Sequence, residues 1–584
     1  MTGPIHLPHF SDPNDVDEFV AVLEQYERGE ISPEKFRAFR LTRGVYGQRQ
    51  EGVQMIRVKI PLGVLAPEQL DALADVAERY TPEAKGHITT RQNFQFHFVK
   101  MSSVEAALRR LDEVGLTTRE ACGNTVRNVT ADPLSGVCAT GLFDVRPYGE
   151  AVIRHLLRAD YDQALPRKFK IALSCCPHDC AMASINDLGL VAAERDGNRG
   201  FRVMCAGGLS TTPQQALVLH DFVPVEEILD VAEALVRLFD RSGNRENKAR
   251  ARLKYVLRKL GEVAFRREYA IERDKIRASG GTPLTDLPAI DDPPPPPRGD
   301  DLGATVEPIS RGPGYVAWRA SNVVPQVQAG YFAVYVQLPL GDLTALQMRA
   351  LARIAPRFGD GSLRTSLDQN LLMRFVPTRQ LPGLFSALTA EGLARPGAAT
   401  VEDVTTCPGA DSCALAVTAS RQLGKLLGDH LSALEGEARV ALGLARSATI
   451  KISGCPNSCG QHHIADLGFH GAVRRFGERS APVYQLHLGG SVHGTTGATF
   501  GRQVIKIPAK RIPTAVERLL LLFARERNTD ESPRAFYHRV AEDRVTALLE
   551  DLSMIDLDAP DAEFMDIGQE QNFKVAIGTG ECAA

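Results

Sequence analysis

The sequence lacks the features of a membrane protein, a nucleic-acid-binding protein or a nucleotide-dependent oxidoreductase. No apolar run approaches the length needed to span a bilayer, and a formal net charge of −3 over 584 residues gives no basic excess. No glycine-rich dinucleotide motif follows a predicted strand, and no flavin motif is evident. The first ten residues carry no charged segment followed by an apolar one, so we expect a cytoplasmic protein. With 44% hydrophobic residues, the chain is expected to form about four domains.

Four of the eleven cysteines form two closely spaced pairs in the last third of the chain. Five residues separate Cys407 from Cys413, and three separate Cys455 from Cys459. Four soft thiolates suit iron–sulfur chemistry, so this pattern favours a [4Fe–4S] cluster. A structural zinc site is the alternative, although its paired ligands usually lie two to four residues apart. Disulfides are disfavoured in the cytoplasm, and most of the other cysteines are expected to be structural: Cys122, Cys138, Cys175, Cys176, Cys180, Cys205 and Cys582.

The segment after a polar arm predicts a compact β-α-β-α unit. Periodicity predicts a helix over 15–29 in the arm, and alternation predicts a strand near 53–60 with Arg57 and Lys59 on its charged face. Helices are expected over 67–80 and 104–116, with a second strand over 87–99 between them. One face of that strand would be aromatic, with Phe94, Phe96 and Phe98, and the other polar, with Arg91, Asn93, Gln95 and His97.

The same unit recurs in the second half of the chain. IPLG at 60–63 recurs as LPLG at 338–341, and QNFQFHFV at 92–99 recurs as QNLLMRFV at 369–376. SCCPHDCAMASINDLGL at 174–190 likewise parallels SGCPNSCGQHHIADLGF at 453–469. This indicates an internal duplication of about 200 residues, with two halves related by an approximate twofold axis. Five consecutive prolines at 293–297 predict an extended linker between the halves.

The two copies differ in charge. The differing positions, first half before second, are Arg57 and Tyr335, Lys59 and Gln337, Arg91 and Asp368, Lys168 and Ser447, and Lys170 and Thr449. In the segment RKFKIALS, residues 167–174, Lys168 and Lys170 are expected on one strand face. Their charges repel each other unless an anion or water lies between them. A solvated face is the common reading of such a pair. The additional arginines of this half, Arg57, Arg91 and Arg127, favour an anion site.

The cysteines show the opposite asymmetry. Cys176 and Cys180 match Cys455 and Cys459, and Cys122 approximately matches Cys407, but Asn128 stands six residues after Cys122. We therefore expect one cluster, held by the second half. A second cluster completed by another residue is the alternative, and an incomplete thiolate set is a poor host for it.

The paired cysteines, the TTRQNFQFH segment and RKFK resemble the assimilatory sulfite and nitrite reductases, which carry sirohaem coupled to a [4Fe–4S] cluster. The resemblance covers about residues 44–545. It implies one [4Fe–4S] cluster held by Cys407, Cys413, Cys455 and Cys459, and one sirohaem at the interface of the halves. By the same resemblance, Cys459 is also the axial ligand of the sirohaem iron.

The resemblance also implies roles for the residues of the first half. It places substrate-anion binding and catalysis on Arg57, Arg127, Lys168 and Lys170. It places sirohaem binding on Arg91, Thr89, Gln95, His97 and Asn128, together with Cys459. Arginines would hold the oxygens of the anion, whereas lysines can also donate the protons needed as each S–O bond breaks.

Six-electron reduction of sulfite to sulfide is the predicted reaction. Dedicated nitrite reductases of this family typically have asparagine where Lys170 stands, so the lysine favours sulfite. The alternative is six-electron reduction of nitrite to ammonia with the same cofactors. A non-catalytic [4Fe–4S] electron-transfer or sensor protein is a further alternative, but such a carrier would not need the cations of the first half.

Electrons are expected to come from another protein, such as a ferredoxin or a flavoprotein. The basic stretch at 241–261 is a possible docking surface, although it reads equally well as a solvated helix face or a sirohaem contact. No nucleic-acid or membrane partner is expected. Tyr46 and Cys122 match positions that are cross-linked in some family members, but a packed tyrosine and a free thiol are favoured here. Cys582, in the glycine-rich tail, has no predicted role.

The predicted fold class is α+β, internally duplicated, with two ferredoxin-like half-domains and two α/β domains for sirohaem and the cluster. The expected boundaries are an arm at 1–43, a half-domain at 44–117, an α/β domain at 118–278, a linker at 279–313, a half-domain at 314–396, the cluster domain at 397–545 and a tail at 546–584.

Overall fold

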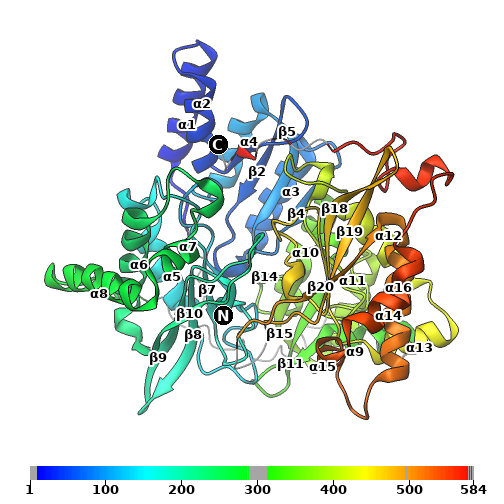
Figure 1. The fold of residues 1–584 in the computed structure, drawn as a ribbon. Helices are drawn as coiled ribbons and strands as arrows, with labels where there is room; N and C mark the ends of the chain where they lie inside the picture. The colour runs from blue at the N-terminus through cyan, green and yellow to red at the C-terminus, as the bar shows by residue number, and fades with distance from the viewer. Residues whose placement is uncertain are drawn as a thin grey trace.

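The structure is a computed structural model that describes residues 9–285, 287, 312–492, 497–575, 578 and 580–581. Most of the predicted proline-rich linker, and Cys582, lie outside the described residues. The described residues form four five-stranded sheets with helices packed around them (Figure 1). None of the described helices is both long enough and apolar enough to cross a membrane.

The two ferredoxin-like half-domains exchange strands. The first sheet has the order β1-β2-β5-β4-β13, built from β1 (Val45–Gly47), β2 (Val53–Val58), β4 (Lys85–Ile88), β5 (Phe94–Lys100) and, from the second half, β13 (Asp342–Thr344). The other has the order β11-β12-β15-β14-β3, built from β11 (Val323–Pro325), β12 (Tyr331–Val336), β14 (Leu363–Thr365), β15 (Leu371–Pro377) and, from the first half, β3 (Val64–Leu65). Each half-domain therefore completes the sheet of the other.

One hydrophobic core joins these two half-domains. Helix α3 (Pro67–Tyr80) packs against its counterpart α10 (Ala345–Phe358) near the middle of Figure 1. Leu70 and Leu73 of α3, Met348 and Leu351 of α10, and Phe94 of β5 are fully buried in the same cluster. Helices α4 (Val104–Asp112) and α11 (Leu381–Ala390) cover the two sheets. Because this core is shared, the interface between the halves is fixed.

The two α/β domains have the same topology. The first sheet contains β6 (Thr130–Ala131), β7 (Ile171–Ser174), β8 (Leu188–Arg195), β9 (Asn198–Cys205) and β10 (Leu217–Pro224). The second contains β16 (Thr405–Thr406), β17 (Ile450–Ser453), β18 (Leu467–Phe476), β19 (Arg479–Leu488) and β20 (Arg502–Pro508). In each sheet the first three strands are parallel and the last two pair antiparallel.

Helices cover both α/β sheets on opposite sides of the molecule (Figure 1). In the first half they are α5 (Arg146–Leu156), α6 (Ile228–Ser242), α7 (Leu253–Leu260) and α8 (Glu262–Ala278). In the second half they are α12 (Ser420–Ser432), α13 (Gly436–Leu444), α14 (Ile512–Glu526), α15 (Pro533–Arg539) and α16 (Glu542–Leu549). Helices α1 (Pro13–Glu27) and α2 (Pro33–Thr42) form the arm, and α9 (Pro313–Asn322) opens the second half.

The duplication is visible in unusual backbone conformations. Non-glycine residues rarely adopt a left-handed φ, yet five such residues occur at matching positions of the two copies. The pairs are Leu62 and Leu340, Gln92 and Gln369, Phe98 and Phe375, Asp179 and Ser458, and Met182 and Gln461. The predicted duplication is therefore confirmed down to individual turns.

The predicted strand over 87–99 is wrong, because this segment is a hairpin. Strands β4 and β5 pair antiparallel, with His87 opposite Gln95, and a turn at 89–92 joins them. The Thr89 hydroxyl caps the turn by accepting the backbone N–H groups of Arg91 and Asn93, both at 3.2 Å. The left-handed Phe98 then shifts the register of β5 against β2, so the alternation does not continue to the end of the strand. Arg91 consequently projects from a turn.

Candidate active site

A cavity of about 260 Å³ brings together the cations of the first half and the cysteines of the second. A second cavity, of about 480 Å³, shares lining residues with it, so the two adjoin: His87, Gln95, His97, Pro408 and Ser412. Most sequence-predicted site residues line the smaller cavity: Arg57, Thr89, Arg91, Gln95, His97, Arg127, Lys168, Lys170, Cys407, Cys413, Cys455 and Cys459. The exception is Asn128, which lies behind the wall and donates to the carbonyls of Ile60 and Arg91 at 2.9 and 3.1 Å.

The four predicted cluster ligands lie on loops that follow two neighbouring parallel strands. Cys407 follows β16, and Cys455 and Cys459 belong to the turn after β17. Cys407 and Cys455 are buried, Cys413 is half-buried, and Cys459 is exposed. Burial raises the pKa of Cys407 to about 11 and also raises the pKa of Cys413 and Cys455. Metal binding to these thiols would therefore release protons.

The spacing of these thiols favours a cluster over a single zinc ion. Tetrahedral zinc with Zn–S bonds of about 2.3 Å requires its sulfurs to lie about 4 Å apart. No three of the Sγ atoms of Cys407, Cys413, Cys455 and Cys459 lie within 4.8 Å of one another, although all four residues are described. The open arrangement around the cavity leaves room for a polynuclear cluster.

The guanidinium groups of the cavity are held by backbone carbonyls. Arg127 donates to the carbonyl oxygens of Gly123 and Ala121 at 2.9–3.0 Å. Arg57 donates to Ala121 at 3.3 Å and to the Cys122 Sγ atom at 3.2 Å. With its amide oxygen turned towards Arg57, Gln95 accepts from Nε at 3.0 Å and from Nη2 at 2.6 Å. These contacts fix the positions of two permanent positive charges.

Lys168 and Lys170 lie on the segment that leads into β7. Burial, followed by the nearby charges of Arg91, Arg252 and Lys168, holds the pKa of Lys170 well below that of an ordinary lysine. Burial likewise lowers the pKa of Arg91 to about 9. Cations that depress each other's pKa in this way are stabilised by a bound anion.

Arg91 braces the hairpin turn against the first α/β domain. Its Nη1 donates to Asn186 Oδ1 at 2.7 Å, and its Nη2 donates to the carbonyls of Asn128 and Ile171 at 2.8 and 3.2 Å. Its buried Nε has no hydrogen-bond partner. In the same turn the Thr90 hydroxyl donates to the carbonyl of Cys459 at 3.1 Å. The hairpin thus links the first α/β domain, which carries Lys168 and Lys170, to the turn that carries Cys459.

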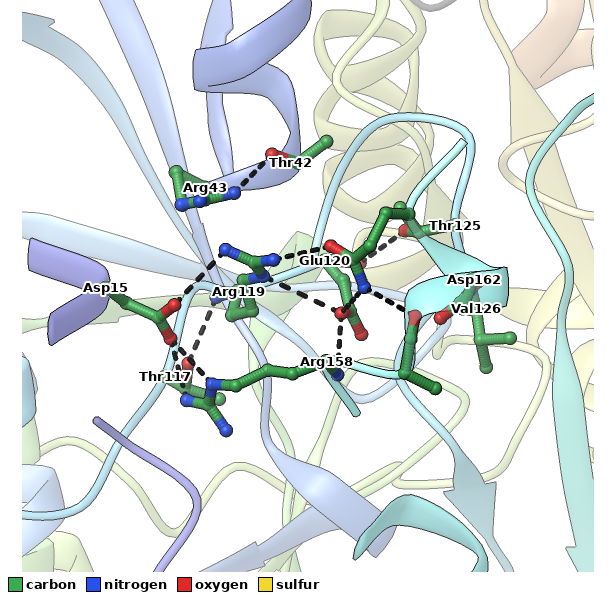
Figure 2. A network of polar contacts seen from close by, with 12 residues as sticks. Asp15, Thr42, Arg43, Thr117, Arg119, Glu120, Thr125, Val126, Arg158 and Asp162 are labelled. Carbon is green, nitrogen blue, oxygen red and sulfur yellow. Dashed lines mark hydrogen bonds and ion pairs between the residues drawn. The ribbon is translucent and has the colours of Figure 1, made fainter. Parts of the chain in front are cut away.

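A polar network anchors the segment from Arg119 to Val126, which leads to Arg127 (Figure 2). Glu120 accepts the backbone N–H of Arg158 at 2.9 Å, and Asp162 accepts that of Val126 at 2.6 Å. Asp15 of α1 accepts from Arg119 at 3.2 Å and from Arg158 at 2.7 Å. The arm, for which the sequence suggested no role, therefore supports the segment that leads to Arg127, one of the predicted anion-binding residues.

Sequence reasoning missed several residues at the site. Arg49 donates from its backbone to Ser412 at 2.9 Å and from its side chain to the carbonyls of Cys413 and Ala416 at 3.3 and 2.6 Å. Arg167, Gln369, Asn457 and Gly580 also line the cavity. Arg167 is the first residue of the RKFK segment, so the sequence could have indicated it. Arg49 lies in a loop, where no periodic pattern points to a role.

The C-terminal tail also reaches the site. Glu581 pairs with Arg40 of α2 and accepts the backbone N–H of Gly47 at 2.6 Å. This places the end of the chain beside the arm (Figure 1). Gly578 donates to the carbonyl of Ala414, one residue after a predicted cluster ligand, at 2.9 Å. The described part of the tail therefore contacts the loop that carries Cys413.

The predicted match between Cys122 and Cys407 is wrong. The N–H of Asp132 bonds to Leu173 on β7, as the N–H of Cys407 bonds to Ile452 on β17. Asp132 is therefore the counterpart of Cys407, and Cys138, six residues on, is that of Cys413. The loops between the two motifs differ in length, which shifts the match. Cys122 instead packs in an apolar cluster with Leu41, Met55 and Tyr46. That Tyr46 and Cys122 pack without a cross-link stays a prediction, which peptide mapping can test.

The first half thus has a side chain that could ligate a metal at each position equivalent to a predicted cluster ligand. One of the four is an aspartate, Asp132, instead of a cysteine. Cys176 and Cys180 have their Sγ atoms 3.6 Å apart. One ligand atom from each of Asp132, Cys138, Cys175 and Cys176 lies within 4.8 Å of the others. The ligand atoms of this group lie closer to one another than the four predicted cluster thiols of the second half do. Its carboxylate is also a hard ligand that iron–sulfur clusters do not favour.

Comparisons with known proteins agree with this architecture. A family model described as "Nitrite and sulphite reductase 4Fe-4S domain" matches residues 122–277 and 397–555, and "Nitrite/Sulfite reductase ferredoxin-like half domain" matches 46–114 and 324–391. A ferredoxin–nitrite reductase of Synechococcus elongatus is 30% identical over 477 residues, which cover 80% of this chain and 85% of that protein. A sulfite reductase (ferredoxin) of Mycobacterium tuberculosis is 28% identical over 521 residues, covering 86% and 88%. The solved structure of the M. tuberculosis NirA protein superposes with a TM-score of 0.75 at 27% identity, covering 91% of this chain and 97% of that one.

Proposed function

Because the chain belongs to the nitrite and sulfite reductase family, we propose that it reduces sulfite to sulfide with six electrons, using one sirohaem coupled to one [4Fe–4S] cluster. The observation that carries this proposal is the shared cavity, which is lined by four cysteines of one half and by the arginines and lysines of the other. The thiols suit an iron–sulfur cluster, and the cations suit a small oxyanion. A pure electron carrier would need only the thiols.

The residues around the two adjoining cavities fit a large acidic macrocycle. Buried polar atoms that face no partner in the protein include Arg91 Nε, Asn93 Oδ1 and His97 Nδ1, and all three residues line the smaller cavity. Arg421 and Lys425 line the larger one and are the groups we assign to the carboxylates, although Arg421 also pairs with Asp342. When bound there, sirohaem coupled to the cluster would supply electrons one at a time to the substrate. Cys459, exposed at the cavity, is the thiol we assign to both metal centres.

The proposed roles of the four cations follow from their chemistry. Arg57 and Arg127 present planar guanidinium groups with several N–H donors, so they would hold and orient the oxygens of the anion. Lys168 and Lys170 carry protons that can be given up, and the lowered pKa of Lys170 makes its ammonium a better acid than that of a free lysine. Each S–O bond that breaks needs protons on the departing oxygen, which these lysines are positioned to supply.

The electron donor is proposed to be a small acidic protein such as a ferredoxin. Part of the basic stretch at 241–261 is engaged inside the protein, because Lys254 donates to Leu209 and Thr212 and Arg252 pairs with the buried Asp187. Those side chains are unsuited to docking. We further propose that the protein works in the cytoplasm, where its thiols stay reduced.

Substrate preference can be measured directly. With reduced methyl viologen as the donor, we expect a higher kcat/KM for sulfite than for nitrite, since Lys170 supplies an additional proton and charge. Nitrite reduction to ammonia is the second candidate, because relatives of both kinds match at 28–30% identity. The same preparation assayed with both anions is its own control, and a higher kcat/KM for nitrite would overturn the sulfite assignment.

A further inference from the structure

Four histidines gather behind the turn that carries Cys459. His462 and His463 lie in a short helix at 462–464, His470 lies on β18, and His487 lies on β19. One ring nitrogen from each of His462, His463 and His487 lies within 4.8 Å of the other two. The ring centroids of His462 and His487 are 4.7 Å apart, and those of His470 and His487 are 4.9 Å apart. Three imidazoles in this arrangement can share one metal ion.

The imidazole ring of His462 lacks the hydrogen bonds that a buried polar group normally makes. Its side chain is fully buried, and neither ring nitrogen has a hydrogen-bond partner. A neutral imidazole carries one donor and one acceptor, and burying both without partners is destabilising. A ligand that accepts a nitrogen lone pair would offset part of that cost.

The neighbouring rings already have the outer contacts of metal-bound histidines. His463 Nε2 lies 2.9 Å from the Ser210 carbonyl oxygen, so it donates and leaves Nδ1 as an acceptor. His487 Nδ1 lies 3.4 Å from the Gly501 carbonyl oxygen and can donate to it. Its Nε2 lies 2.7 Å from His470 Nδ1, and an ion bound at Nε2 would replace this contact. In metal sites the second nitrogen of a ligating histidine commonly donates to a backbone carbonyl, which fixes the ring.

Burial disfavours the charged form of all four rings. It is the main cause of the lowered pKa in each, and neighbouring histidines add to it, lowering the pKa of His487 to about 3 and that of His470 to about 4. Burial also lowers the pKa of His462 and His463. Neutral imidazole is the form that binds metal.

The first half shows that the fold does not require histidines at these positions. Gly189 pairs with Met204 across β8 and β9 as Gly468 pairs with His487 across β18 and β19. By this register Ala183, Val191 and Met204 are the counterparts of His462, His470 and His487. In the first half the three pack with Ala216 into a small apolar cluster. The second half has thus replaced a satisfied apolar cluster with polar rings.

We propose that His462, His463 and His487 bind one Zn²⁺ ion, which ties β19 to the turn leading out of Cys459. Imidazole nitrogens suit zinc, and three histidines with a fourth open position are a common zinc geometry. His470 is half-buried and marks the side from which the ion enters. No carboxylate belongs to the group, and Lys254 and Lys506 are the nearest charges acting on His463 and His470. The ion therefore stays uncompensated, so a strong chelator should remove it.

The test is the zinc content of the full-length enzyme, purified anaerobically from zinc-supplemented cells and desalted by gel filtration. The decisive variant, His462→Ala/His470→Val/His487→Met, copies the residues of the first half and so preserves packing. Cys176→Ser is the matched control, because the contracted Asp132, Cys138, Cys175 and Cys176 group is the other possible zinc site among the described residues. Iron content is recorded alongside, which separates this inference from the proposed reductase function.

We expect about one zinc per wild-type chain beyond any held by the thiol group, and its loss in the triple variant with unchanged iron. Chelator should lower the Tm of the wild type and leave that of the triple variant unchanged. Wild-type protein without zinc would overturn the inference. So would a triple variant with the same zinc content as the wild type, or zinc that is lost only in Cys176→Ser.

Discussion

Cys459→Ser is expected to reduce sulfite reduction to background. All three thiols line the cavity, but Cys459 is exposed, whereas Cys407 and Cys455 are buried. Its thiolate is the ligand we assign to both the cluster and the sirohaem iron, and a serine hydroxyl is a harder, weaker ligand for either. The measurement is turnover with reduced methyl viologen, read together with the absorption spectrum and the iron content of the same sample.

Cys180→Ser is the matched control for this prediction. Cys180 occupies the equivalent position in the first half, where an aspartate replaces one of the four thiolates. It should therefore keep its activity, spectrum and iron content. A Tm comparable to the wild type would show that the Cys459 variant is folded. Full activity in Cys459→Ser would refute the assignment of this thiol.

Lys170→Met is expected to lower kcat for sulfite by about 10²-fold or more, the usual cost of losing a positioned proton donor. Lys170→Arg retains the charge but cannot release its proton, so KM should recover towards the wild-type value while kcat stays low. Lys170→Asn should move the preference from sulfite towards nitrite. Lys275→Met on α8, whose side chain is 64% exposed, serves as a control and should behave like the wild type. A change in kcat of less than about twofold in Lys170→Met would remove this lysine from the mechanism.

The pH profile gives an independent reading of the same residue. Burial and neighbouring cations hold the Lys170 pKa well below the ordinary lysine value. As pH rises through that lowered pKa, the ammonium loses its proton, and both the charge and the acid are lost. The wild-type kcat/KM should therefore fall at a lower alkaline pH than an unperturbed lysine would allow, and Lys170→Arg should lack that alkaline limb. An unchanged limb in Lys170→Arg would assign it to another group.

The cavity could be predicted from the sequence largely because the chain is duplicated. Comparing the copies showed that the cations belong to one half and the four closely spaced thiols to the other. The periodicity that predicts a helix or a strand also located α1, α3, α4 and β2. Periodicity is a local property of the sequence, and the duplication can be seen by comparing one half of the chain with the other. Both can therefore be recognised in a single sequence.

The features that were missed depend on long-range contacts or short turns. The exchanged strands β3 and β13 have two and three residues, too few for a periodic pattern. The hairpin at 89–92 depends on one threonine hydroxyl, and Asp132 could be matched to Cys407 only through backbone pairing. Arg49 and Glu581 act across more than 360 residues of sequence, so nothing near them indicates their partners.

The most direct test of the account is the iron and sirohaem content of the anaerobically purified protein. One cluster and one sirohaem predict about five irons per chain and a sirohaem absorption band together with a broad cluster shoulder. Cys455→Ser should lose the cluster iron, whereas its first-half counterpart Cys176→Ser should retain it. A cluster spectrum without sirohaem, a colourless zinc protein, or a second cluster lost in Cys176→Ser would contradict the account.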